Sequence, residues 1–204
     1  MKRLSLAIVF ACCTLTVAAQ EEGFRVNYQG AKPTIKDFAK AYITSLLNPE
    51  DEEPEGEWLY MYESIQKAIG CQDKGQPLEE EETLTIDQKN VVLVYEQKHD
   101  DYLTRIEMCY WNDADGKHKL FADNRWSFEK GKLSMGQYDH LSFYRYDNAT
   151  KKMARCNTPG FDVEYFNKSY ALPRTGKNIT VTTWEDNGKK TEKPLKWNGH
   201  GFSY

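Results

Sequence analysis

The sequence predicts an α+β protein in which two N-terminal helices pack on a curved, mostly antiparallel multi-stranded sheet. Two observations point to this class. Apolar residues recur at helical spacing in two segments before residue 70, whereas nearly every segment after Leu84 has the pattern of a strand followed by a turn. Helices followed by a series of strands are typical of α+β proteins. A β-barrel or β-sandwich with a helical lid is the alternative, because many antiparallel strands can also close or stack.

Residues 1–19 have the features of a secretory signal peptide. A charged dipeptide follows the first methionine, a mostly apolar stretch runs to Val17, and two small residues end at Ala19. We therefore expect cleavage after Ala19. The apolar stretch is shorter than the about 20 residues of a transmembrane helix, so no transmembrane span is expected after cleavage. A lipoprotein anchored at Cys12 is less favoured, because the apolar stretch continues past this cysteine.

The chain after the signal peptide is expected to form one domain, with a helical part and acidic loops at residues 20–83 and an antiparallel β part at residues 84–204. Thr34 predicts the N-cap of the first helix, because Asp37 completes a capping box three residues later. The helix is expected to end at Asn48, since a residue that precedes a proline avoids the helical region. Its apolar stripe consists of Ile35, Phe38, Ala39, Tyr42, Leu46 and Leu47.

The second predicted helix follows an acidic loop at residues 50–57. Gly70 is expected to end this helix, because glycine is the residue that most often adopts the left-handed conformation behind a helix. A second acidic run at residues 79–82 then leads to the strands. The apolar stripe of the helix consists of Trp58, Tyr62, Ile65 and Ile69.

The strands are predicted from alternating or continuously apolar segments. Residues 91–95 form a continuous apolar run, which indicates a central strand, and residues 102–111 alternate as a half-buried strand requires. Asp115-Gly116 and Asn187-Gly188 predict tight hairpin turns, because glycine accepts a positive φ angle. A cone of the nuclear transport factor type is a third arrangement, although the number of strands is high for it. Further strands are expected at residues 119–123, 126–129, 132–135, 141–146, 153–156, 162–166, 178–185 and 193–197.

Composition and charge argue against several classes of function. The net charge is −4 at pH 7 and no basic cluster is present, so nucleic acid is not expected as a partner. The histidines do not occur at metal-ligand spacings, and no nucleophile elbow or glycine-rich phosphate loop is found. We therefore expect no metal, no cofactor and no recognisable catalytic residue. The cysteines that remain after signal cleavage are Cys71, Cys109 and Cys156. Because their number is odd, they cannot all form disulfides, and the sequence does not decide whether two of them pair.

Two short motifs have ordinary structural explanations. Residues 113–116 resemble a fragment of a calcium loop, but Trp111 stands where the full loop needs an acid, so a hairpin turn is expected. Residues 172–176 match a cell-wall sorting pentapeptide, but the apolar span and basic tail that should follow are missing. We expect a proline turn that leads into a strand.

The aromatic residues near three turns suggest a ligand site. Hairpin turns in a meander alternate between the two ends of a sheet. When the turns are counted along the chain from the turn at Lys98, the turns near residues 113, 139 and 186 are predicted to share one end. Trp111, His140 and Trp184 would then surround one rim, where a sugar or another small polar ligand could bind. The alternative is that both tryptophans cover the edge of the core.

Several segments carry a resemblance to a known group of proteins: residues 170–179, the hairpin after them, residues 195–199, Phe202 and the Val-Ala-Ala-Gln end of the signal. Together they resemble uncharacterised exported proteins of the Bacteroidetes. The resemblance implies an exported protein, periplasmic or secreted, and no assigned activity. We expect a non-enzymatic protein that binds a small ligand, a glycan or an envelope partner. A hydrolase with an unrecognised active site is the alternative.

Overall fold

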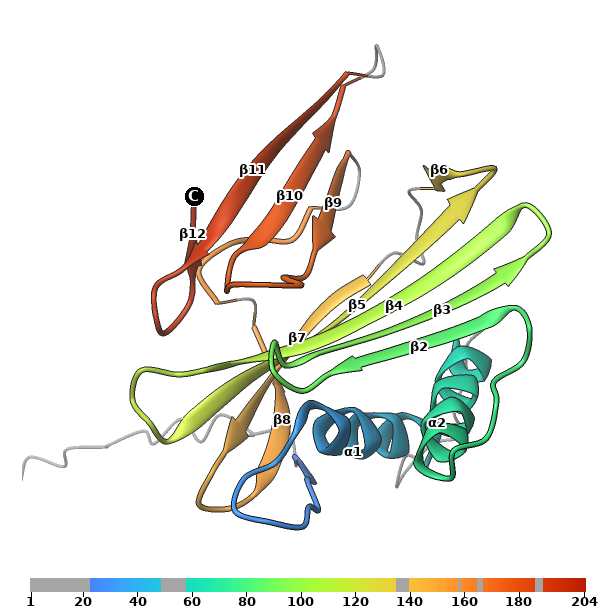
Figure 1. The fold of residues 1–204 in the computed structure, drawn as a ribbon. Helices are drawn as coiled ribbons and strands as arrows, with labels where there is room; N and C mark the ends of the chain where they lie inside the picture. Colours follow the sequence, from blue (N-terminus) through green and yellow to red (C-terminus); the bar gives the residue numbers. More distant parts are fainter. Residues whose placement is uncertain (1–22, 49–57, 135–139, 158, 165–166, 186–188) are drawn as a thin grey trace, which may run out of the picture.

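The computed structural model describes residues 23–48, 58–134, 140–157, 159–164, 167–185 and 189–204. Within these residues the chain forms two helices and two antiparallel sheets, one of eight strands and one of four (Figure 1). The α+β class with mostly antiparallel strands is thus confirmed. The described strands of the large sheet do not close into the barrel of the alternative, because the sheet has separate edges at β1 (Phe24–Arg25) and β2 (Glu82–Asp87).

The strand order shows which parts of the chain meet. The large sheet has the order β1-β8-β7-β5-β4-β3-β2 with β6 paired to β5, and the small sheet has the order β12-β11-β10-β9. The two strands predicted at residues 119–123 and 126–129 form one continuous strand. A strand was also predicted at residues 162–166, but residues 162–164 do not form one. The remaining bounds are β3 (Val92–His99), β4 (Tyr102–Asn112), β5 (His118–Glu129), β6 (Lys132–Ser134), β7 (His140–Asp147), β8 (Lys152–Cys156), β9 (Lys168–Ala171), β10 (Ile179–Trp184), β11 (Lys190–Trp197) and β12 (Phe202–Ser203).

Helix α1 (Ile35–Leu47) begins and ends where the sequence predicts. The backbone N–H of Thr34 donates to Oδ2 of Asp37 at 2.8 Å, and the backbone N–H of Asp37 donates to Oγ1 of Thr34 at 3.3 Å. These reciprocal bonds form the capping box. Asn48 is the C-cap, directly before the proline that prevents a further turn.

Helix α2 (Leu59–Asp73) ends later than the sequence predicts, so the expectation that Gly70 ends it is wrong. The helix continues through Gly70, and Lys74 is its C-cap. Gly75 then has a φ angle of 66°, which is the left-handed conformation expected directly behind a helix. The glycine that follows the helix is therefore Gly75, five residues further along the chain than the predicted Gly70.

Gly70→Ala is expected to raise the free energy of unfolding by about 0.5–1 kcal/mol, because alanine favours a helix interior over glycine. A Cβ atom at this position would meet no heavy atom within 4 Å. Gly116 is a matched control with equally open surroundings, but its φ angle is +69°. Gly116→Ala should therefore lower the free energy of unfolding by about 1 kcal/mol. Denaturant unfolding of both variants measures this difference, and shifts of the same sign would contradict it.

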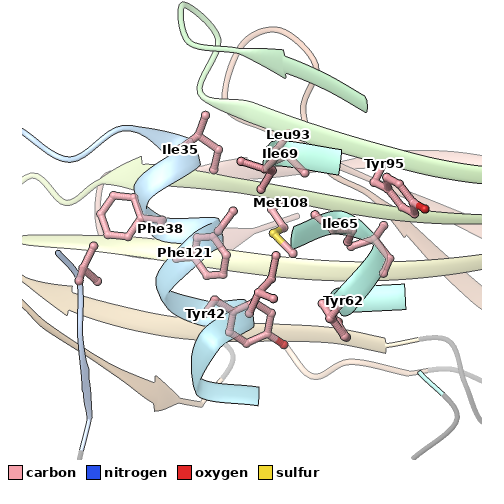
Figure 2. Packing of buried hydrophobic residues seen from close by; sticks show 14 of the residues in the cluster. Ile35, Phe38, Tyr42, Tyr62, Ile65, Ile69, Leu93, Tyr95, Met108 and Phe121 are labelled. Carbon is pink, nitrogen blue, oxygen red and sulfur yellow. The ribbon is translucent and has the colours of Figure 1, made fainter. Parts of the chain in front are cut away.

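The first hydrophobic core lies between the helix pair and one face of the large sheet (Figure 2). Phe38 of α1 packs against Phe121 of β5 and Tyr146 of β7, with ring centroids 6.1 and 4.9 Å apart. Alternate strand residues reach this core, as Leu93 and Tyr95 of β3 do.

The second core lies between the other face of the large sheet and the small sheet. Val92 and Val94 of β3 belong to it, and Val181 of β10 and Leu195 of β11 approach from the small sheet. Both faces of the first half of β3 are thus covered, which explains why residues 92–95 are continuously apolar.

A buried polar contact also joins the two sheets. Glu107 and Asn124 are cross-strand partners on the face toward the small sheet. The Asn124 amide donates to the carbonyl oxygen of Tyr170 at 2.6 Å, and the Leu172 N–H donates to Oε2 of Glu107 at 3.0 Å. Arg174 donates to Oε1 of Glu107 at 3.1 Å, but burial outweighs this contact and raises the pKa of Glu107. The segment 172–176 thus contributes a connection between the sheets.

Candidate functional site

Trp111 is part of the second core. Its side chain is 3% exposed, and its indole N–H donates to the carbonyl oxygen of Lys177 at 2.8 Å. The ring stacks on Trp197 with centroids 5.9 Å apart and meets the ring of Phe202 edge-on at 5.0 Å. Trp111 therefore fills the space between the sheets.

His140 and Trp184 lie away from Trp111. His140 pairs with Arg125, which in turn pairs with Ile106, five residues before Trp111 on β4. That separation is about 17 Å along the strand. The side chain of His140 lies outside the described residues.

Trp184 stands at the other end of the small sheet from the Trp111 contacts. It is the last residue of β10, five positions beyond the core residue Ile179, and its indole N–H donates to Oγ of Ser169 at 3.3 Å. The three residues thus do not surround one rim, and the geometric argument for that rim is wrong. The rim was predicted from the alternation of successive hairpin turns, which required two strands in place of β5 and a single sheet containing both β4 and β10. Ligand binding by any of these residues stays a prediction.

The structure places another aromatic pair on one face of the large sheet. Trp126 and Phe128 of β5 have ring centroids 5.9 Å apart and an angle of 11° between the ring planes. Both side chains are partly exposed, and neither belongs to one of the two cores. Together with Glu96 and Arg105 they form what we call the aromatic platform. In Figure 1 the hairpin between β5 and β6 lies apart from the small sheet.

Arg105 and Glu96 give the aromatic platform its polar component. The guanidinium carbon of Arg105 lies 5.2 Å from the centroid of the Phe128 ring, and Nε donates to Oε1 of Glu96 at 2.6 Å. Their side chains are 27% and 29% exposed. An arginine has five N–H donors, and the bond to Glu96 uses the Nε donor. The arrangement combines flat apolar surfaces with a fixed donor and a fixed acceptor.

A second group of polar residues is buried between the helices and the large sheet. The carboxylate of Asp123 is 0% exposed, and its Oδ2 accepts the hydroxyls of Tyr62 at 2.6 Å and of Tyr42 at 3.1 Å. Figure 2 shows the two tyrosines beside each other, with ring centroids 5.8 Å apart. Burial raises the pKa of Asp123 to about 6, although the Tyr62 bond and the charge of Arg125 act against this shift. Burial also raises the pKa of both tyrosines.

A third group lies at the β4–β5 turn. His118 bonds to Asp115, and His200 lies 2.7 Å from Oδ1 of Asp113 through its Nδ1 atom. The backbone N–H of Asp115 also donates to Oδ1 of Asp113 at 3.0 Å, as expected for a turn. Over the part of the chain that the structure describes, three or more His, Cys, Asp or Glu residues do not gather as metal ligands would. These contacts join the turn to the C-terminal loop.

The cysteines are too far apart to pair within the sheet. Cys109 and Cys156 stand at the same level of the large sheet, but Ala122 of β5 and Phe143 of β7 lie between them. Three strand spacings amount to about 14 Å, which exceeds the reach of a disulfide. Cys71 at the end of α2 is free as well.

The chain matched no model of a protein family, no curated protein and no solved structure. Neither α1 nor α2, the helices among the described residues, is long and apolar enough to span a membrane.

The aromatic platform could have been found from the sequence. Trp126 and Phe128 are separated by one residue, so they share a face if the segment is a strand. The predicted rim instead consisted of residues close to turns, with Trp111 and Trp184 as its aromatics. Arg105 and Glu96 gave no such signal, because their contact depends on the register between β3 and β4.

Proposed function

We propose that the protein is an exported, non-enzymatic protein that binds a glycan on the aromatic platform. The observation that carries this proposal is the nearly parallel pair of Trp126 and Phe128 rings outside both cores. The signal peptide features support a periplasmic or secreted location. A different small ligand or an envelope protein is the alternative occupant. For the fold, we also propose that the large sheet curves around the helix pair, which the shared first core supports.

The chemistry of the aromatic platform suits a sugar. A pyranose ring has an apolar face of C–H groups that packs on an aromatic ring, and its hydroxyls need donors and acceptors at the edge of that face. The Trp126 ring stacks on the Phe128 ring, and the Arg105 guanidinium lies over Phe128, so the aromatic pair offers a packing surface for one sugar unit beside a charged group. Arg105 and Glu96 supply the donor and the acceptor, and their mutual bond holds both side chains in place before a ligand binds.

The experiment compares the full chain with single variants on a glycan array, followed by calorimetric titration of each glycan that binds. Trp126→Ala and Phe128→Ala should each weaken binding by about tenfold or more, which corresponds to about 1.4 kcal/mol. Tyr60→Ala is the matched control, because Tyr60 is an aromatic residue of α2 that is 55% exposed. It should bind like wild type. The proposal fails if wild type binds no glycan, or if folded Trp126→Ala keeps the wild-type affinity.

A hydrolase is the less favoured function. The described group most like an acid–base site is Asp123 with its two tyrosines, but its carboxylate is 0% exposed and cannot reach a substrate in this structure. Hydrolysis of a glycan that binds, measured for wild type and for Asp123→Asn, tests this function. Product formed by wild type but not by the variant would favour the hydrolase over the binding protein.

A further inference from the structure

Two buried polar atoms belong to neighbouring side chains on the helix side of β5. Asp123 and Arg125 are two positions apart and project from the same face, so their Cα atoms are about 7 Å apart along the strand. Oδ1 of Asp123 and Nε of Arg125 are both buried, and neither has a hydrogen-bond partner among the described residues. Buried polar atoms of this kind are rare in folded proteins and call for an explanation.

The neighbouring groups fix both side chains. The two tyrosine hydroxyls hold the other oxygen of Asp123, and the guanidinium carbon of Arg125 lies 4.9 Å from the centroid of the Trp58 ring. Oδ1 of Asp123 is an acceptor and Nε–H of Arg125 is a donor. A group that fits both must donate one hydrogen bond and accept another.

This requirement selects the chemistry of the bound group. A carboxylate would be repelled by Asp123, and an ammonium group could not accept from Arg125. A hydroxyl oxygen has both an O–H donor and lone pairs. We infer that a hydroxyl oxygen, belonging to water or to an alcohol group of a small molecule, binds in the layer between the helices and β5, donating to Oδ1 of Asp123 and accepting from Nε of Arg125. The site is independent of the aromatic platform, which lies on the opposite face of β5.

The bound oxygen would join three elements in one polar network. Asp123 already accepts from Tyr42 of α1 and Tyr62 of α2, and the oxygen extends this network to Arg125 and, through its ring contact, to Trp58. Networks of this kind in a water-poor interior strengthen each member when all of its groups are satisfied. The same site explains why an arginine stands on the face that packs against the helices.

A crystal structure of the full exported chain at high resolution tests the inference directly. We expect one oxygen peak within about 3.2 Å of both Oδ1 of Asp123 and Nε of Arg125. Native mass spectrometry distinguishes the two sources: water leaves only the polypeptide mass after desolvation, whereas an alcohol-bearing ligand adds mass that is lost on denaturation. A direct bond between the two side chains, or a site with no density in a well-ordered structure, would overturn the inference.

A variant measurement in solution adds an independent test. Arg125→Met keeps the length of the side chain but removes the donor, so a long-lived internal water or ligand signal, detected by magnetic relaxation dispersion or native mass spectrometry, should be lost. Arg145→Met is the matched control: Arg145 of β7 pairs with Leu120, lies on the opposite face of the sheet and is 45% exposed, so this variant should keep the signal. A signal that is unchanged in folded Arg125→Met would contradict the proposed site, and the wild-type crystal structure decides the matter if this variant does not fold.

Discussion

Trp111→Ala is expected to lower the free energy of unfolding by about 3–5 kcal/mol, which is typical for truncation of a large buried aromatic residue. Trp111 is 3% exposed, and the rings of Trp197 and Phe202 lie against it. Alanine would leave a cavity between the sheets and would also remove the donor that bonds to the Lys177 carbonyl. Denaturant unfolding at equilibrium measures the loss.

Trp184→Ala is the matched control for this prediction. Trp184 is a partly exposed tryptophan at the opposite end of the small sheet and belongs to neither core. Its truncation should cost less than half of the loss in Trp111→Ala. A stable Trp111→Ala protein that has lost the binding of a glycan would instead support a ligand site at Trp111.

The helices could be predicted because their signals are local. Thr34 and Asp37 form the capping box within one turn. At the other end, Asn48 precedes Pro49 in the sequence, and a residue before a proline avoids the helical region.

The end of α2 depends on more than a local signal. Gly70 and Gly75 are both glycines near the end of an apolar stripe. The helix continues past Gly70 to Asp73, whose carboxylate pairs with Lys36 and Lys40 of α1, and Gly75 takes the left-handed conformation.

Strand β5 was harder to predict as one element, because polar residues in its middle are buried. Asp123, Asn124 and Arg125 interrupt the apolar pattern and look like a turn in the sequence. In the structure two of them are buried: Asp123 bonds to tyrosines of the helices, and Asn124 bonds to the backbone of β9. Their partners lie 46 to 81 residues away in the chain, so no local pattern could indicate them.

The same long-range contacts explain why the second sheet and the candidate sites were missed. A strand pattern shows which faces are apolar but does not show which sheet the strand joins. Glu107 looks like a solvent-facing residue of an alternating strand, yet its carboxylate bonds to Leu172 and Arg174 between the sheets. Trp111 lies on the same face of β4, four positions further along, and is buried for the same reason.

The stability of the protein is expected to depend on Asp123 between about pH 4 and pH 6. The pKa of Asp123 is about 6 in the folded protein and 3.8 ordinarily, so the folded state binds this proton more tightly than the unfolded state does. The contribution is complete below about pH 4 and is lost as the pH rises through 6. A difference of about two pKa units corresponds to about 3 kcal/mol.

Asp123→Asn isolates this contribution, because asparagine can still accept the tyrosine hydroxyls and does not ionise. Relative to the variant, wild type should lose about 3 kcal/mol of stability between pH 4 and pH 7, as measured by denaturant unfolding at each pH. Asp87→Asn is a control for the sign: bonds from Asn90 lower the pKa of Asp87, so its contribution should instead be lost as the pH falls below 4. A wild-type curve parallel to that of Asp123→Asn would show that the Asp123 carboxylate ionises in the folded protein as readily as in the unfolded chain, which would contradict its burial under α1 and α2.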